Sequence, residues 1–259
     1  MEDRDVATVA AWVERSERLV VLTGAGISTE SGIRDFRGPD GVWTRDPGAE
    51  ARANIAYYVA HREARVEVWQ RRLQAPPYAG DPNAGHLALG ELDLQGRLAV
   101  VLTQNVDGLH QRGGVDPGRV VELHGTVREF MCLSCDARGP IDVILDRVRA
   151  GDEDPHCEIC TIGILKAATV SFGQALFPGD MERAEQATRA CDLFIAIGST
   201  LQVYPVAALA PLAKRCGALL VIINDSPTPF DAEADAVLRG RIGEILPELV
   251  PSHPPTTRR

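Results

Sequence analysis

Four cysteines stand at the spacing of a structural metal site. They form two pairs, Cys132 with Cys135 and Cys157 with Cys160, and each pair encloses two residues. Two such pairs roughly twenty residues apart are typical of zinc ribbons, in which four thiolates fill the tetrahedral shell of Zn²⁺ and leave no position for water. The pattern therefore predicts one structural zinc ion per chain, and four unliganded core cysteines are the weaker alternative.

A second candidate site is a glycine-containing turn near the N-terminus. Gly24, Ala25 and Gly26 follow an apolar run, residues 19–22, that is expected to form a buried strand. Glycine lets the backbone approach a pyrophosphate, and the next helix can direct its N-terminus at the negative charge. Thr29 replaces the third glycine of the dinucleotide fingerprint, so on this motif alone a simple tight turn is an equal alternative.

One histidine follows a further apolar stretch. His124 comes directly after residues 120–123, so its imidazole is predicted to lie at the same sheet edge as the glycine turn. An imidazole with a pKa near neutrality can act as a general base. A lone histidine is more often structural, and its position alone favours that interpretation.

A parallel sheet must position these residues. Four short runs are apolar throughout rather than alternating, as strands buried on both faces are, and helical stretches separate them. They cover residues 19–22, 99–102, 193–197 and 218–223. Apolar residues at helical spacing predict a first helix around residues 6–13 and a last one around 242–249. The fold class is predicted to be α/β, a Rossmann-like parallel sheet with helices on both faces.

Two stretches interrupt the alternation of strands and helices and are expected to form a smaller module. Residues 38–79 are mostly helical and charged, and residues 131–166 carry the four cysteines. Together they predict a small zinc-ribbon and helical domain, with the active site in the cleft beside it. The remaining segments, 1–37, 80–130 and 167–250, are assigned to the large dinucleotide-binding domain, and the tail 251–259 is expected to be disordered.

Charge and hydropathy disfavour some classes of partner. Acidic residues outnumber lysine and arginine by 36 to 27, which disfavours a nucleic-acid-binding role because phosphate neutralisation needs clustered basic residues. No apolar run approaches the roughly 18 residues needed to cross a bilayer, and the N-terminus lacks the pattern of a secretory signal. A cytoplasmic protein that binds neither nucleic acid nor membranes is expected.

Seven motifs, taken together and in this order, resemble those of the sirtuin family, in its bacterial form. The resemblance extends from about residue 19 to residue 249, which is nearly the whole chain. The motifs are Gly24-Ala25-Gly26-Ile27-Ser28, Gly32-Ile33-Arg34-Asp35-Phe36-Arg37, Gln104-Asn105-Val106-Asp107, Leu123-His124-Gly125, the two cysteine pairs, Phe172-Gly173-Gln174 and Gly198-Ser199-Thr200-Leu201.

The resemblance implies an NAD-dependent protein lysine deacylase, chiefly a deacetylase, that yields nicotinamide, O-acyl-ADP-ribose and free lysine. NAD would be the co-substrate, zinc a structural ion, and acyl-lysine proteins or peptides the partners. His124, as general base, and Asn105 correspond to the catalytic residues. The residues implied to contact NAD are Gly24, Ala25, Gly26, Thr29, Asp35, Phe36, Arg37, Gln104, Asn105, Val106, Asp107, Gly198, Ser199, Thr200, Asn224 and Ile242.

The substrate peptide is implied to add as a strand between two segments. Its contacts would be Val170, Phe172, Gly173, Val203 and Tyr204. Sirtuins that prefer succinyl- or malonyl-lysine carry a Tyr-x-x-Arg pair, where this chain has Trp69 and Arg72, or Arg71 if the alignment shifts by one residue. Because indole donates only through its ring nitrogen, the clamp is incomplete and a preference for acetyl or longer uncharged acyl groups is predicted.

Two other functions use the same features. A protein mono-ADP-ribosyltransferase would use the same NAD pocket and His124, and a non-catalytic NAD-sensing module would use the zinc ribbon as an anchor. The chain departs from the family pattern at Arg34, where proline is usual, at Gln174, and in the order of Ser199 and Thr200. None of these departures removes a group with a chemical role.

Overall fold

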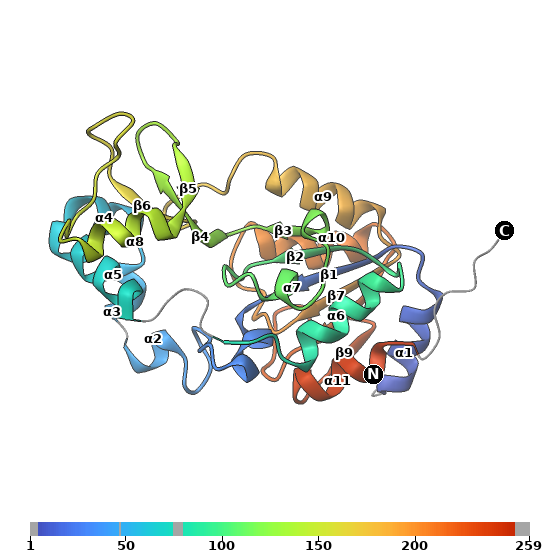
Figure 1. The fold of residues 1–259 in the computed structure, drawn as a ribbon. Coiled ribbons are helices and arrows are strands. Elements are labelled where there is room, and N and C mark those ends of the chain that lie inside the picture. Colours follow the sequence, from blue (N-terminus) through green and yellow to red (C-terminus); the bar gives the residue numbers. More distant parts are fainter. Residues whose placement is uncertain (1–4, 47, 75–79, 252–259) are drawn as a thin grey trace.

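The structure is built around a six-stranded parallel sheet (Figure 1). The computed structural model describes residues 5–46, 48–74 and 80–251. The strand order is β3-β2-β1-β7-β8-β9, and every neighbouring pair is parallel. The strands are β1 (Leu19–Thr23), β2 (Leu98–Thr103), β3 (Val120–Glu122), β7 (Leu193–Ile197), β8 (Leu219–Ile223) and β9 (Ala236–Leu238). The four predicted strands are confirmed, and β9 is an additional edge strand that sequence patterning missed.

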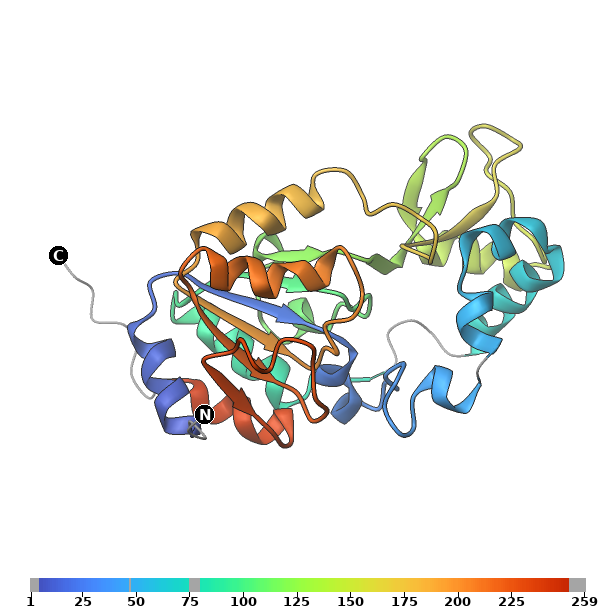
Figure 2. The ribbon, with the colours of Figure 1, turned by 180° about the vertical axis from the view of Figure 1, so that it is seen from behind.

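Helices cover both faces of this sheet, as predicted. One face packs against α1 (Val6–Arg15), α6 (Ala84–Leu94) and α11 (Ile242–Leu249), and the other against α9 (Asp180–Ala190) and α10 (Leu209–Arg215) (Figure 2). Side chains alternate along each strand, so Val21 joins the first hydrophobic cluster and Val20 the second. Burial on both faces explains why these strands are continuously apolar.

A smaller, antiparallel sheet lies apart from the large one (Figure 1). Its strand order is β5-β4-β6, with β4 (Gly125–Cys132), β5 (Arg138–Pro140) and β6 (Leu165–Thr169). Helices α4 (Ile55–Ala60), α5 (Arg62–Gln74) and α8 (Ile141–Arg149) pack beside it. Strand β4 begins at Gly125, so the boundary expected at residue 130 lies inside a strand.

Short elements connect the two sheets and complete the loops at the strand ends. They are η1 (Ala25–Ser31), α2 (Val42–Arg45), α3 (Gly48–Arg52), α7 (Leu109–Arg112), η2 (Pro117–Arg119) and η3 (Val206–Ala208). The element after Gly24 is thus a 3₁₀ helix rather than a longer α-helix. Asn83 caps the start of α6, and its amide also donates to Ile27 O at 2.7 Å, which ties η1 to that helix.

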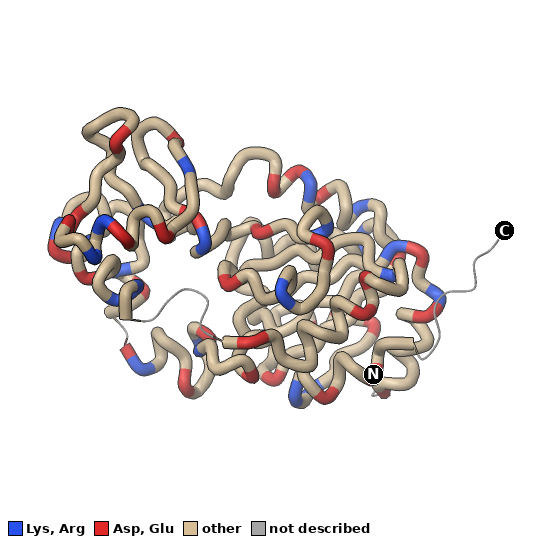
Figure 3. Tube along the Cα trace, in the orientation of Figure 1, with Lys and Arg blue, Asp and Glu red and all other residues tan. Residues whose placement is uncertain are grey.

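Acidic and basic residues are interspersed over both sheets and their helices (Figure 3). None of the described helices is both long and apolar enough to span a bilayer. Residues 252–259, most of the tail expected to be disordered, lie outside the described residues.

Candidate functional site

Four loops meet at the carboxyl ends of the central strands. Backbone hydrogen bonds tie each loop to the neighbouring strand: Gly24 N to Ile197 O, Gln104 N to Thr23 O and Leu123 N to Thr103 O, each 2.9 Å, and Gly198 N to Ile223 O, 2.8 Å. This convergence brings the glycine turn, the segment after β2 and His124 to one edge of the sheet, where ligands of open parallel sheets bind.

The glycines of the turn are required by the neighbouring loop. A Cβ added to Gly24 would lie 2.7 Å from Gly198 O, and one added to Gly26 would lie 2.7 Å from Gly198 Cα. Gly198 itself has a φ of 60° and would clash with Ile27 N. These glycines therefore allow two loops to pack directly on each other, a reason for glycine that differs from close approach to a phosphate.

A buried polar network connects η1 to the loop after β2. Asn105 Nδ2 donates to Ser28 Oγ and to Gly24 O, both at 3.1 Å, and Ser28 Oγ donates to Asp107 Oδ2 at 2.8 Å. Asp107 also accepts from Leu109 N. All three network side chains are buried. Ser28 is absent from the predicted contacts, although it lies in the glycine motif, because only the fold brings it between the other two residues.

His124 is held by a single backbone carbonyl. Its Nδ1 lies 3.1 Å from Gln104 O. Because a carbonyl can only accept, Nδ1 carries the proton and Nε2 keeps its lone pair, which no hydrogen bond from the described part of the chain occupies. Burial lowers the pKa of His124, so the ring is neutral near pH 7. Gln104 is fixed in turn, since Ser199 Oγ donates to its Oε1 at 2.7 Å.

Phe36 and Arg37 lie in an exposed loop and contact one tryptophan. The Arg37 guanidinium lies 4.4 Å from the centre of the Trp43 ring, and the Phe36 ring is 4.8 Å from it. Trp43 also contacts Phe172, with ring centroids 5.4 Å apart. This aromatic cluster joins the loop predicted to contact NAD to the segment predicted to contact the peptide.

The other predicted NAD contacts occupy several loops. Asp35 Oδ1 accepts from Gly38 N at 3.2 Å, and Thr29 Oγ1 donates to Gly26 O at 2.9 Å. Asn224 Nδ2 donates to Ser226 O at 2.7 Å in the loop after β8. Ile242 begins α11 and is largely buried in the first hydrophobic cluster. Ala25 and Thr200 are half-buried at the strand ends, and Val106 O accepts from Val127 N at 3.1 Å.

One edge of the segment containing Val170 and Phe172 is already hydrogen-bonded to other parts of the backbone. Val170 N donates to His124 O at 2.8 Å, while Phe172 N donates to Ala53 O and Phe172 O accepts from Ile55 N. No hydrogen bond between described residues joins this segment to Val203 or Tyr204. Gly173 and Tyr204 are both exposed, and Val203 is half-buried.

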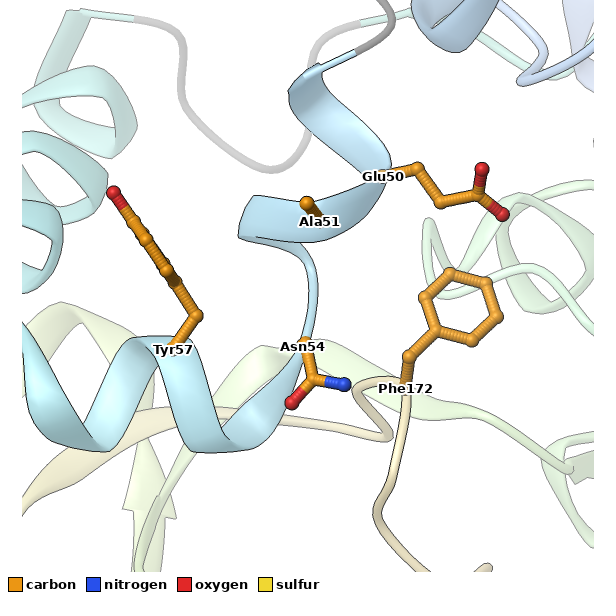
Figure 4. Close-up of a pocket in the computed structure, with 5 residues that line it drawn as sticks. All are labelled: Glu50, Ala51, Asn54, Tyr57 and Phe172. Atoms are coloured by element: carbon orange, nitrogen blue, oxygen red, sulfur yellow. The ribbon is translucent and has the colours of Figure 1, made fainter.

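An open hollow of about 530 Å³ lies beside Phe172. Figure 4 shows the Phe172 ring and the Glu50 carboxylate on one side of this hollow and the Tyr57 ring on the other. Ala51 and Asn54 complete the lining. The hollow therefore adjoins a segment that the family resemblance assigns to the substrate.

Trp69 and Arg72 lie in the module of the small sheet. Trp69 is fully buried in a cluster with Cys132 and Ile141, and its ring nitrogen has no hydrogen-bond partner among the described residues. Arg72 is half-buried, and burial lowers its pKa; its Nε has no hydrogen bond to the part of the chain that the structure describes. The indole is thus a core side chain.

The four paired cysteines converge at one end of the small sheet. Their sulfurs all lie within 4.8 Å of one another, and the pairs Cys132–Cys160 and Cys135–Cys157 are each 3.7 Å apart. A tetrahedron with metal–sulfur bonds of about 2.3 Å has edges of about 3.8 Å, so the set fits Zn²⁺. A Cβ on Gly163 would lie 2.2 Å from Cys132 Sγ, which explains the glycine there.

Comparison with known proteins places this arrangement in a family. The Sir2 family model matches residues 24–205. NAD-dependent protein deacetylase 2 of Streptomyces coelicolor is 47% identical over 90% of this chain and 96% of that protein. NAD-dependent protein deacetylase 1 of Bradyrhizobium diazoefficiens is 44% identical over 92% of each. A solved complex of Sir2 with a p53 peptide and NAD⁺ is 32% identical, with a TM-score of 0.82, over 94% of this chain and 96% of that one. The chain therefore belongs to the Sir2 family, the sirtuins.

Proposed function

We propose that the chain is an NAD-dependent protein lysine deacylase, chiefly a deacetylase, that yields nicotinamide, O-acyl-ADP-ribose and free lysine. The observation that carries the proposal is the neutral His124, whose Nε2 is unoccupied beside the buried network of Asn105, Ser28 and Asp107. The names of the relatives, NAD-dependent protein deacetylases, and the peptide and NAD⁺ in a solved neighbour support it.

Different loops at the strand ends would contact different parts of NAD. Asn105 and Asp107 would receive the nicotinamide carboxamide, because Asn105 Oδ1 and the Asp107 carboxylate can both accept from its amino group. Ala25, Thr29 and the exposed Phe36 and Arg37 would hold the diphosphate and ribose. Gly24, Gly26, Asp35, Gln104, Val106 and Gly198 would shape the pocket, with Ser199, Thr200, Asn224 and Ile242 on the adenosine side.

His124 would accept a proton from a ribose hydroxyl through Nε2. NAD, when bound, supplies an anomeric carbon with nicotinamide as leaving group, and the acyl oxygen of the substrate attacks that carbon. The Gln104 carbonyl keeps the proton of His124 on Nδ1, so the basic nitrogen is the one left open. General-base catalysis of this kind typically contributes about 10²- to 10⁴-fold.

The acyl-lysine peptide would add to the other edge of the segment that holds Val170, Phe172 and Gly173. Val170 and Phe172 bond toward His124 and α4, whereas Ser171 N donates to Gln174 Oε1 at 3.2 Å and Ser171 O accepts from Gln174 N at 3.0 Å, so the peptide would replace these local bonds of Gln174. A strand there would also reach Val203 and Tyr204. Backbone pairing gives affinity with little dependence on peptide sequence.

The two sheets would correspond to two domains with separate tasks. Residues 1–37, 80–130 and 167–250 would form the NAD-binding domain, and 38–79 with 131–166 the small domain. Zn²⁺ held by Cys132, Cys135, Cys157 and Cys160 would be structural, because four thiolates leave no open position. A reducing compartment such as the cytoplasm suits these thiolates.

Mass spectrometry of a reaction with NAD and an acetyl-lysine peptide tests the proposal. The expected products are deacetylated peptide, nicotinamide and O-acetyl-ADP-ribose. A protein mono-ADP-ribosyltransferase would instead produce a labelled protein, and a binding module would leave NAD intact. Either of these outcomes, with folded and zinc-loaded protein, would overturn the proposal.

A further inference from the structure

Two buried histidines lie behind the polar network. His86, on α6, and His110, on α7, are 0% and 1% exposed, and their ring centroids are 5.1 Å apart. Burial lowers the pKa of His86 to about 4 and that of His110 to about 3, so both rings are neutral. Neither belongs to the proposed contacts with NAD or peptide.

A chain of hydrogen bonds leads from His110 to the backbone of Asn105. His110 Nε2 lies 2.8 Å from Thr23 Oγ1, which donates to Thr103 Oγ1 at 2.8 Å. Thr103 Oγ1 also accepts from Asn105 N at 3.0 Å. Since the single hydroxyl hydrogen of Thr23 points to Thr103, His110 Nε2 is the donor to Thr23. The chain thus joins α7, the last residues of β1 and β2, and Asn105.

The tautomer of each ring follows from its partners. His86 Nδ1 accepts from Asn83 N at 3.4 Å, so its proton is on Nε2. His110 carries its proton on Nε2, so its Nδ1 is bare. The two remaining nitrogens, His86 Nε2 and His110 Nδ1, have no hydrogen-bond partner among the described residues. A merely structural core site would be filled more favourably by apolar side chains, because unpaired buried nitrogens cost free energy.

We infer that His110 is a positioning residue for the nicotinamide carboxamide. Its Nε2–H orients the hydroxyls of Thr23 and Thr103, and Thr103 in turn holds the backbone of Asn105. The Asn105 amide is thereby aimed at Gly24 O and Ser28, in the place where the carboxamide would bind. The inference rests on the proposed function of Asn105, and it predicts that His110 affects binding of NAD and nicotinamide but not of the peptide.

Two substitutions of similar polarity separate this role from packing. Glutamine can place its amide nitrogen near the position of Nε2, whereas the shorter asparagine reaches only the position of Nδ1. The dissociation constants of NAD, nicotinamide and an acetyl-lysine peptide would be measured by calorimetry on wild type, His110→Gln and His110→Asn, together with turnover and melting temperature.

We expect His110→Asn to weaken NAD and nicotinamide binding by about tenfold, as loss of one buried hydrogen bond does, and to leave peptide binding within about twofold. His110→Gln should stay within about threefold of wild type for all three ligands. Equal effects of the two substitutions on NAD and nicotinamide, or a loss of peptide binding in parallel with NAD, would overturn the inference.

A third variant keeps the test decisive if His110→Asn does not fold. Thr103→Val preserves shape but removes the acceptor of Asn105 N, so it should weaken nicotinamide binding by a similar factor. Unchanged nicotinamide binding in folded Thr103→Val protein would also contradict the inference. Absence of O-acetyl-ADP-ribose from the wild-type reaction would instead refute the proposed function, since binding is measured without turnover.

Discussion

At the scale of single residues, the hydrogen bond between His124 Nδ1 and Gln104 O decides which nitrogen can act as a base. The bond has two consequences. It places the proton on Nδ1, and it directs Nε2 away from the Gln104 carbonyl. The peptide bond that supplies this carbonyl lies at the end of β2, so the orientation of the imidazole depends on the sheet rather than on a flexible side chain.

Replacing His124 by alanine should abolish deacylation while NAD affinity stays within about tenfold, because the base acts after NAD is bound. Product formation by mass spectrometry and NAD binding by calorimetry measure the two effects. His61→Ala is the matched control, since that imidazole sits at the end of α4 and bonds Tyr57 O. Substantial turnover in His124→Ala would show that another group is the base.

The pH dependence of kcat/KM should report His124. Only the neutral imidazole can accept a proton, and burial lowers its pKa from the ordinary value of 6.5. Activity is therefore expected to be constant above about pH 6.5 and to fall as the pH drops through the lowered pKa. Burial lowers the pKa of His86 to about 4 and that of His110 to about 3, so both rings stay neutral near pH 6.5. An acid limb centred above 6.5 would contradict this assignment.

At the scale of elements, the cysteine cluster brings β4 together with the connection between α8 and β6. Cys132 is the last residue of β4, while Cys157 and Cys160 lie in the connection between α8 and β6. A metal ion bound by all of them would fasten this connection to the strand. The ion would contribute directly to folding, because the four thiolates come together only in the folded chain.

Cys157→Ser should yield aggregated or protease-sensitive protein without bound zinc, because a tetrahedral site loses one of its thiolates. Zinc content by elemental analysis and limited proteolysis measure the outcome. The matched control, Cys216→Ser, changes an exposed cysteine outside the cluster and should behave as wild type. A stable, zinc-free and active Cys157→Ser protein would refute the structural role of the metal.

A buried ion pair joins α5 to the connection between α8 and β6. Arg65 donates to both oxygens of Asp154 at 2.9 and 2.7 Å, and the two side chains are only 9% and 8% exposed. Asp154→Asn should lower the free energy of unfolding by about 3–5 kcal/mol, because it leaves the guanidinium buried without a counter-charge.

Urea unfolding of the zinc-loaded protein measures this loss. The neighbouring Glu153→Gln removes an exposed pair with Arg62, whose side chains are 60% and 61% exposed, and should change stability by less than about 1 kcal/mol. Similar losses in both variants would mean that burial of the Arg65–Asp154 pair is not what stabilises this connection.

At the scale of the whole molecule, we expect the acyl group to contact the small module. The Trp69 indole is in the core of that module and can donate only through its ring nitrogen, so a two-donor clamp with Arg72 is expected to be incomplete. A buried carboxylate with one partner costs more desolvation than it regains. We therefore expect kcat/KM for an acetyl-lysine peptide to exceed that for the matched succinyl peptide by at least about tenfold.

Arg72→Met should leave this preference unchanged, as should the control Arg71→Met, whose side chain is exposed and paired with Glu67. Steady-state kinetics on the two peptides measure the preference. A higher kcat/KM for the succinyl peptide that is lost in Arg72→Met would show that a single guanidinium suffices to receive a carboxylate.

Local patterns in the sequence were sufficient for much of the fold. The apolar runs before Gly24, Gln104, Gly198 and Asn224 predicted the central strands, because burial on both faces imposes a continuous apolar pattern. Strand β9 was missed, since three residues at a sheet edge carry little periodic signal. The extent of β4 was also missed, because its pairing with β6 depends on residues far along the chain.

The sequence by itself determined the family, the two cysteine pairs and the parallel sheet, since each depends on residue types at short and regular spacing. Only the tertiary structure decided the partners of the polar side chains. Ser28 meets Asp107 across 79 positions and Asn105 across 77, and Thr23 meets His110 across 87. Hydrogen bonds between such distant positions leave no periodic pattern, because they form only when parallel strands align their carboxyl ends at one edge.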